Sequence, residues 1–223
     1  MKRMIILLGI VIELSFPSNS LSQSINWRNL NKTQKHILSV NMGIEYGLIL
    51  GAGYGYQLKF NRPIVLGLEY SFPIGKKIFD DSKTKMGVLV GINQTGNIHY
   101  CVKIQSVFRR YESDLVRLIN IGSDFSVMAG YYRKKWFVAG EAGFDKAIAT
   151  HFKHSERFKE IYPMVRDGWY EPSTGGNFYY GLQTGLSVGK MDVYLKAGKL
   201  VTEDFRSEPM IPFTVQLGFN IKI

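Results

Sequence analysis

The side chains best suited to chemistry lie between positions 149 and 176, where His154, Ser155 and Glu156 follow one another. A hydrolase needs a nucleophile, a base and an orienting group in mutual contact, and neighbours along an extended chain point in different directions. His151 and His154 offer two metal ligands, but no third ligand follows at a recognised spacing. The sequence therefore predicts no catalytic residue, no bound metal and no cofactor.

The elements that would hold these residues are β-strands, because apolar and polar residues alternate along most of the chain. A period of two marks a strand with two unlike faces. In residues 211–223 every odd position from Ile211 to Ile223 is apolar, and the even positions are mostly polar. This alternation predicts ten strands, at residues 37–46, 51–60, 63–72, 84–93, 97–109, 125–132, 136–148, 177–188, 191–201 and 211–222.

The connections between these strands provide an independent check on their number. Residues 38–60 alternate without a break, yet a bilayer crossing needs only about 9–11 tilted residues, so we place a tight turn near Gly47–Gly51. From the second connection onward, short turns alternate with longer segments at 73–83, 110–124, 149–176 and 202–210. Outer-membrane barrels alternate in this way between periplasmic turns and external loops, and they use an even number of strands. Ten strands fit, and eight is the alternative.

Three features favour a barrel whose apolar faces point outward to lipid rather than inward. The less apolar faces are rich in glycine and carry isolated charges, unlike the densely charged faces of soluble sheets. Residues Gln216–Ile223 resemble the C-terminal assembly signal of outer-membrane barrels, although this chain ends in Ile where Phe is usual. Aromatic residues gather near strand ends, as they do at the two membrane interfaces: Tyr46, Phe60, Tyr70, Phe72, Phe108, Phe125, Tyr132, Trp136, Phe178 and Tyr180.

In these features the chain resembles the small outer-membrane β-barrel proteins of the OmpA/OmpX type, in pattern rather than in residue identity. The resemblance implies an all-β fold: a single antiparallel, up-and-down transmembrane β-barrel in the outer membrane of a Gram-negative envelope. It also implies outer-membrane lipids and the barrel assembly machinery as partners, and we expect a monomer. It implies no particular activity, because a fold does not fix a function.

The isolated charges on the inward faces form the first set of candidate site residues. Unpaired charges are costly inside a narrow barrel, so we expect opposite charges to pair and to block the lumen. A barrel of about eight strands has an interior just filled by side chains, which excludes a general porin at ten strands. The expected lumen network consists of Glu45, Lys59, Glu69, Lys103, Arg109, Glu141, Asp145 and Lys196.

The longest connection, 149–176, supplies the second set of candidates, because loops on rigid scaffolds carry specificity. Its side chains suited to binding are His151, His154, Trp169 and Tyr170. We expect the stretch around Trp169 and Tyr170 to fold back over the barrel opening as a lid.

The N-terminus predicts a secretory signal. Lys2 and Arg3 precede an apolar run, and Ser20-Leu21-Ser22 fits a cleavage site. We therefore divide the chain into a signal peptide at 1–22, a short periplasmic lead-in at 23–36 and the barrel at 37–223. The single cysteine, Cys101, allows no intramolecular disulfide.

The basic residues that give the formal net charge of +10 are distributed unevenly over the predicted topology. Basic residues fall in the lead-in and the predicted periplasmic turns, whereas the external segment 149–176 is nearly balanced. No basic groove with interleaved stacking aromatics is present, so nucleic-acid binding is not expected. The sequence thus favours a non-enzymatic barrel with a structural role or a binding role for its loops. A narrow conduit for a small or apolar solute and a lipid-modifying outer-membrane enzyme are the alternatives.

Overall fold

The computed structural model describes residues 24–31, 33–75, 80–172, 175–206, 209 and 211–223. The expected signal peptide lies outside these residues. The described part is almost entirely strand, and none of its helices has the length and apolarity needed to cross a membrane. Its elements are η1 (Trp27–Asn29), β1 (His36–Ile44), β2 (Leu48–Leu58), β3 (Ile64–Pro73), β4 (Asp81–Thr95), β5 (Ile98–Glu112), β6 (Val116–Tyr132), β7 (Trp136–His154), α2 (Glu156–Ile161), β8 (Gly168–Tyr170), β9 (Gly176–Val188), β10 (Met191–Thr202) and β11 (Phe213–Lys222).

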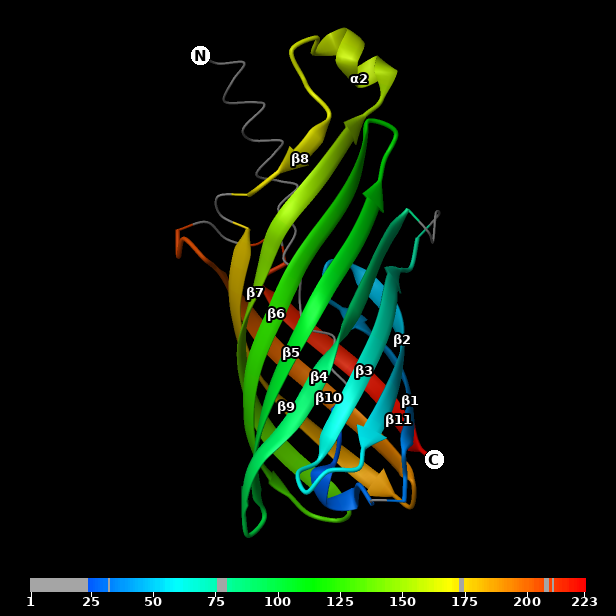
Figure 1. Ribbon diagram of the computed structural model, residues 1–223, viewed down its shortest axis with the longest axis vertical. Coiled ribbons are helices and arrows are strands. Elements are labelled where there is room, and N and C mark those ends of the chain that lie inside the picture. The colour runs from blue at the N-terminus through cyan, green and yellow to red at the C-terminus, as the bar shows by residue number, and fades with distance from the viewer. Residues whose placement is uncertain (1–23, 32, 76–79, 173–174, 207–208, 210) are drawn as a thin grey trace.

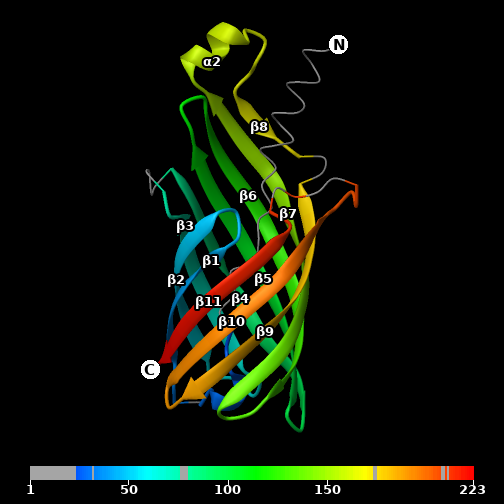
Figure 2. The same cartoon turned by 180° about the vertical axis from the view of Figure 1, so that it is seen from behind.

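Ten of these strands form one closed antiparallel barrel (Figures 1 and 2). Each barrel strand pairs with the next one along the chain, β7 pairs with β9, and β1 pairs with β11 to close the ring. The short β8 is an addition that pairs only with the far end of β7. The prediction of a ten-stranded up-and-down barrel is confirmed. A tight turn does separate β1 from β2, but it lies at residues 45–47, ahead of the predicted position near Gly47–Gly51.

Burial along the strands is inverted relative to a soluble protein. In β9, Leu182, Leu186 and Val188 on the outer face are 65–70% exposed, whereas Gln183 and Ser187 between them are buried. Lys83 and Glu45 are among the most deeply buried side chains of the described residues. An outward apolar wall around a charged interior is the arrangement of a membrane barrel.

The structure corrects the strand boundaries on the external side. Residues 110–124 were expected to form a long loop, but β5 continues to Glu112 and β6 begins at Val116. Beyond the hydrocarbon layer nothing requires outward side chains to be apolar, so Arg117 and Ser123 face outward and Leu118 faces inward. Polar and apolar residues therefore occur on both faces here, and the alternation that identifies a strand from its sequence is weakened.

For the same reason β7 runs on to His154, within the segment expected to be the longest loop. Strands β5, β6 and β7 therefore rise beyond the rest of the wall, with α2 at their tip and β8 beside β7 (Figures 1 and 2). The segment around Trp169 and Tyr170 lengthens the sheet in this extension. It does not fold back as the expected lid, because backbone pairing with β7 fixes its direction.

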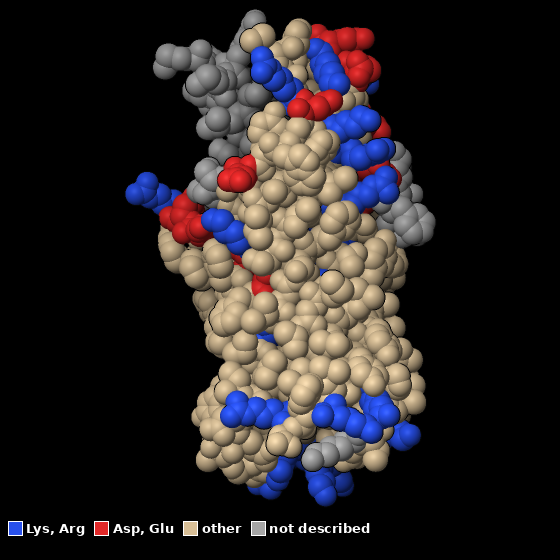
Figure 3. Space-filling view, in the orientation of Figure 1, with Lys and Arg blue, Asp and Glu red and all other residues tan. Residues whose placement is uncertain are grey.

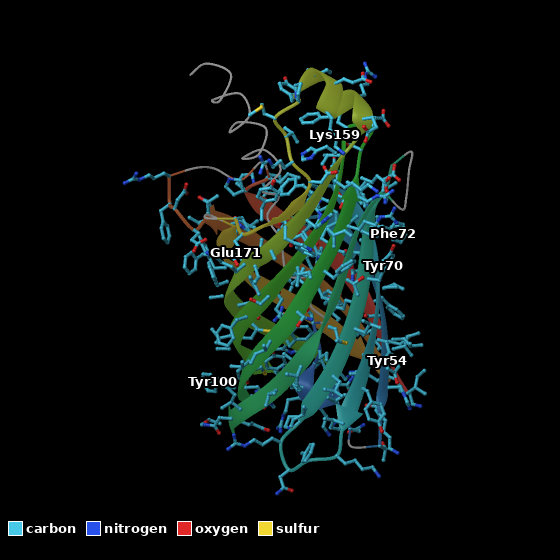
Figure 4. The ribbon with its side chains drawn as sticks, turned by 45° about the horizontal axis from the view of Figure 1, so that its top comes forward. Tyr54, Tyr70, Phe72, Tyr100, Lys159 and Glu171 are labelled. Carbon is cyan, nitrogen blue, oxygen red and sulfur yellow. The ribbon has the colours of Figure 1, made fainter. Side chains whose placement is uncertain are left out.

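Aromatic residues occupy the outer wall toward both ends of the barrel. Figure 4 shows Tyr70 and Phe72 toward the external end and Tyr54 and Tyr100 nearer the periplasmic end. Two of the predicted interface residues, Tyr46 and Tyr132, instead point into the lumen. Tyr132 is 1% exposed, since residues two apart share a face and it has the parity of inward residues such as Ser126.

Candidate functional site

A cluster of ion pairs crosses the external half of the lumen. Lys103 on β5 lies 3.2 Å from Glu141 on β7, and the second oxygen of Glu141 lies 2.5 Å from Lys196 on β10. Asp124 on β6 lies 3.5 Å from Lys85 and 4.0 Å from Lys103. One shared cluster thus connects strands β4, β5, β6, β7 and β10 through the interior.

A second group of charges lies at the external end of the same half. Lys83 Nζ lies 2.7 Å from Glu45 Oε1. Arg109 holds Asp81 with two hydrogen bonds of 2.9 and 2.6 Å. The Tyr46 ring lies 4.4 Å from both the Lys83 ammonium and the Arg109 guanidinium, a geometry that stabilises cations over an aromatic face.

Glycine on the inner wall makes room for a large side chain in this cluster. The Tyr179 hydroxyl donates a 2.7 Å hydrogen bond to Asp124. A Cβ at Gly143 would overlap the Tyr179 ring. Glycine at position 143 therefore leaves the space that this ring occupies against the inner wall.

The buried charges of the described lumen balance. Desolvated charges need partners of opposite sign, and the fully buried set contains equal numbers of each sign. Asp81, which is partly buried and pairs with Arg109, adds a carboxylate at the external end. The buried cations are Lys83, Lys85, Lys103, Arg109, Lys196 and Lys222, and the buried anions are Glu45, Glu69, Asp124, Glu141, Asp145 and Asp192.

Lys59 is the one predicted network residue that lies elsewhere. It follows the last residue of β2 and is exposed in the turn before β3, because the strand ends at Leu58. The other seven predicted residues face the lumen: Glu45, Glu69, Lys103, Arg109, Glu141, Asp145 and Lys196.

Sequence reasoning missed five of the buried lumen charges, namely Lys83, Lys85, Asp124, Asp192 and Lys222. The predicted strands began too late to contain Lys83 and Asp124, whereas the other three lay inside predicted strands and were overlooked. The signal was present, because Lys83 and Lys85 have the parity of inward Gly87 and Leu89. Asp124 likewise has the parity of inward Ser126.

The periplasmic half of the lumen is filled differently, by the chain segment before β1. The Asn26 side chain donates hydrogen bonds to Ser187 at 2.7 Å and to the carbonyl of Arg133 at 2.9 Å. Asp192, which accepts from Ser187 at 2.6 Å, also pairs with Lys222 at 2.8 Å. The expected lead-in therefore enters the barrel, and residues 24–27 are buried there.

Ile25 and Trp27 of this segment pack into an apolar cluster inside the barrel. The Tyr132 and Phe137 rings stack there with centroids 5.4 Å apart. Many inward positions at this end are apolar, and Ile25 and Trp27 pack against them as core residues would. The cluster consists of Ile25, Trp27, Ile37, Val65, Leu89, Cys101, Met128, Tyr132, Phe137, Ala139 and Tyr194.

Two cavities beside the ion pairs show how little space these side chains leave. Each has a volume of about 20 Å³, roughly the space of one water molecule. One is lined by Glu69, Lys103 and Gln105, the other by Glu141, Lys196 and Gln216. Neither accommodates a sugar or a comparable solute.

The structure brings the four predicted external residues together on the extension. His151 and Trp169 lie edge to face with ring centroids 5.2 Å apart, and Tyr170 packs on Phe152 at 5.5 Å. His154 Nδ1 lies 2.9 Å from Asp167 Oδ1. Trp169 and Tyr170 remain 57% and 46% exposed.

Asp167 ties the connection between α2 and β8 to the end of β7. It accepts hydrogen bonds from the His154 backbone N–H and lies 2.9 Å from Lys159. These contacts, the backbone bond above all, hold the pKa of Asp167 well below its usual range. The lowered pKa favours the charged carboxylate at neutral and mildly acid pH.

Comparison with known proteins finds distantly similar solved structures and no related family. No protein-family model and no curated protein matches the chain. Similar solved structures include the KdgM porin (6% identity, 84% of this chain and 99% of that chain, TM-score 0.41) and the KdgM porin in complex with disordered oligogalacturonate (6%, 84% and 99%, 0.42). CdiB from Acinetobacter baumannii is also similar (9%, 87% and 60%, 0.29). The assignment stands on the closed strand pairing, the outward apolar wall and the charged lumen, which make the chain an outer-membrane β-barrel protein.

Proposed function

We propose that this protein is a non-enzymatic outer-membrane barrel with a closed lumen that binds a ligand through its external extension. The observation that carries the proposal is the continuation of β5–β7 beyond the wall, which presents Trp169 and Tyr170 on a paired, rigid sheet. Exposed aromatic rings on a rigid support bind with little loss of conformational entropy. The two cavities beside the ion pairs of the lumen, of about 20 Å³ each, are too small for such a ligand.

The local geometry around Ser155 supports a binding role over a catalytic one. Ser155 caps α2, and its hydroxyl accepts a hydrogen bond from the backbone N–H of Phe158. The neighbouring His154 ring stacks with Phe152 and Phe158, with centroids 6.1 and 5.1 Å apart, while its Nδ1 contacts Asp167. Each side chain thus has a structural partner that orients it for local contacts.

A binding array tests this proposal. The barrel, held in nanodiscs, would be applied to arrays of soluble oligosaccharides and extended peptides. We expect binding to at least one class, lost when Trp169→Ala and Tyr170→Ala are combined. Trp136→Ala, at the opposite end of the wall, is the matched control and should leave binding intact. Equal signals from the double variant and the unaltered protein would contradict the proposal, provided that both show heat-modifiable gel mobility.

A narrow conduit is the second candidate, and one observation favours it. Residues 24–27 are held in the lumen by side-chain contacts rather than by strand pairing, so they can in principle leave without opening the wall. In planar bilayers we expect the whole protein to be silent. Conductance that appears only after deletion of residues 24–30 would favour the conduit, whereas conductance of the whole protein would overturn the closed lumen.

A further inference from the structure

The periplasmic end of the barrel carries positive charge without compensating negative charge. Six cations lie in three of the four periplasmic turns, and all six are exposed. None of the four turns contains Asp or Glu. We call these cations the basic rim: Lys59, Arg62, Arg133, Lys134, Lys135 and Lys190. On the face shown in Figure 3, Lys and Arg cover the lower end without any Asp or Glu beside them.

The external end differs, because several of its basic side chains are paired with carboxylates. Arg110 and Arg117 both contact Glu112, at 2.5 and 2.7 Å, and Lys146 pairs with Glu203 at 2.5 Å. Within the described residues, no rim cation forms an ion pair. The Arg133 guanidinium instead bonds the Tyr131 hydroxyl at 2.8 Å, a neutral partner. The positive charges of the rim are thus not neutralised by carboxylates of the described residues and can interact with anions outside the protein.

The rim begins where the apolar outer wall ends. Trp136 follows Lys135 directly and is 42% exposed, and Val188 and Met191 flank the turn of Lys190. In a membrane this is the level of the lipid headgroups, and basic side chains there attract anionic lipid. Long Lys and Arg side chains also reach from the hydrocarbon edge to the phosphate layer.

We propose that the basic rim binds the phosphate groups of anionic phospholipids in the periplasmic leaflet, and so enriches such lipids around this end of the barrel. Continuity with the hydrocarbon-facing wall favours a lipid over an acidic protein, because a headgroup bound at the rim places its acyl chains against Trp136, Val188 and Met191. This site is separate from the external aromatic surface, so either proposal can fail alone.

Trp136 is a built-in reporter of this lipid layer. The chain has three tryptophans: Trp27 is buried in the lumen, and Trp169→Phe removes the external one. The protein would be placed in phosphatidylcholine vesicles containing phosphatidylglycerol, with brominated chains on one lipid or the other. We expect Trp136 quenching to report a preference for phosphatidylglycerol on the order of fivefold, the typical contribution of one basic side chain near an anionic surface. The preference should fall at high salt.

Two triple variants make the test specific. Combining Arg133→Gln, Lys134→Gln and Lys135→Gln should reduce the preference toward one, with the heat-modifiable mobility of a folded barrel retained. Combining Arg110→Gln, Arg117→Gln and Lys153→Gln removes the same number of cations from the external end and should leave the preference unchanged. Equal quenching by the two brominated lipids in the unaltered protein would overturn the proposal. So would a preference that survives the rim variant.

Discussion

The two halves of the lumen are closed by opposite means. The external half is crossed by ion pairs around Glu141 and Lys103, whereas the periplasmic half is packed mainly by Trp27 and Ile25 against apolar side chains, beside the buried Asp192–Lys222 pair. Ion pairs connect strands that are already in the wall, while the apolar half depends on a segment that is not a strand. The comparison shows that one end of a barrel can be closed by ion pairs between its strands and the other by an inserted chain segment. We expect the two closures to respond differently to mutation.

The largest effect should come from breaking the ionic half at its shared carboxylate. Glu141→Gln removes the negative charge that Lys103 and Lys196 both contact. Breaking a buried ion pair typically costs about 3–5 kcal/mol, and we expect a loss of this size in urea unfolding from lipid vesicles. Glu203→Gln, in the half-exposed pair with Lys146, is the control and should cost about 0–1 kcal/mol. Similar losses in both variants would contradict the central role of Glu141.

The apolar half should be next most sensitive, at Trp27. Truncation of a buried Trp to Ala costs about 3–5 kcal/mol in soluble cores. We expect the lower end of that range, because the segment can detach while the wall stays paired. Unfolding in urea measures the loss, and β-strand content by circular dichroism should be unchanged. A loss of the barrel itself would show that the segment is part of the wall's stability.

Asn26 separates the polar from the apolar contribution to the periplasmic closure, because its side chain holds residues 24–27 by hydrogen bonds. Asn26→Ala leaves Ser187 and the carbonyl of Arg133 without that donor, a change of about 1–2 kcal/mol. We expect Ser24→Cys, in a Cys101→Ser background, to become severalfold more reactive to a thiol reagent applied from the periplasmic side. Unchanged reactivity would mean that Ile25 and Trp27 suffice to hold the segment.

The smallest effect should be a pH response confined to the external extension. The pKa of Asp167 is lowered in the folded protein, so its contribution is present above the ordinary Asp pKa of about 3.9 and is lost as the pH falls through the lowered value. The chemical shift of the Asp167 carboxyl carbon, measured by NMR, should therefore remain that of a carboxylate from neutral pH to about pH 5. A transition within that interval would contradict the assigned contacts.

The sequence predicted the barrel because the membrane imposes strict alternation on every crossing strand. Leu182, Leu186 and Val188 must all be apolar to face hydrocarbon, so the pattern there is clear. The extension could not be predicted, since water on its outer side tolerates Arg117 and Ser123 at positions that would otherwise be apolar. Lys83 and Asp124 were missing from the predicted lumen network, because the strand ends that carry them were assigned to loops.

The burial of residues 24–27 could not be predicted either. Its cause is the shape and polarity of the periplasmic opening, where Ser187, Asp192 and the carbonyl of Arg133 converge. These groups lie at two periplasmic turns that are far from residues 24–27 in the sequence, and no local pattern predicts their convergence. The exposed position of Lys59 follows from the end of β2 at Leu58, two residues earlier than alternation alone indicates.

The inverted wall is tested most directly by spin labels at four positions of β9, namely 182, 183, 186 and 187, on the reconstituted protein. Labels at Leu182 and Leu186 should collide with oxygen dissolved in the hydrocarbon and be shielded from a water-soluble nickel complex. Labels at Gln183 and Ser187 should be protected from both. The account is contradicted if the order is reversed, with positions 183 and 187 meeting lipid, or if the nickel complex reaches positions 182 and 186.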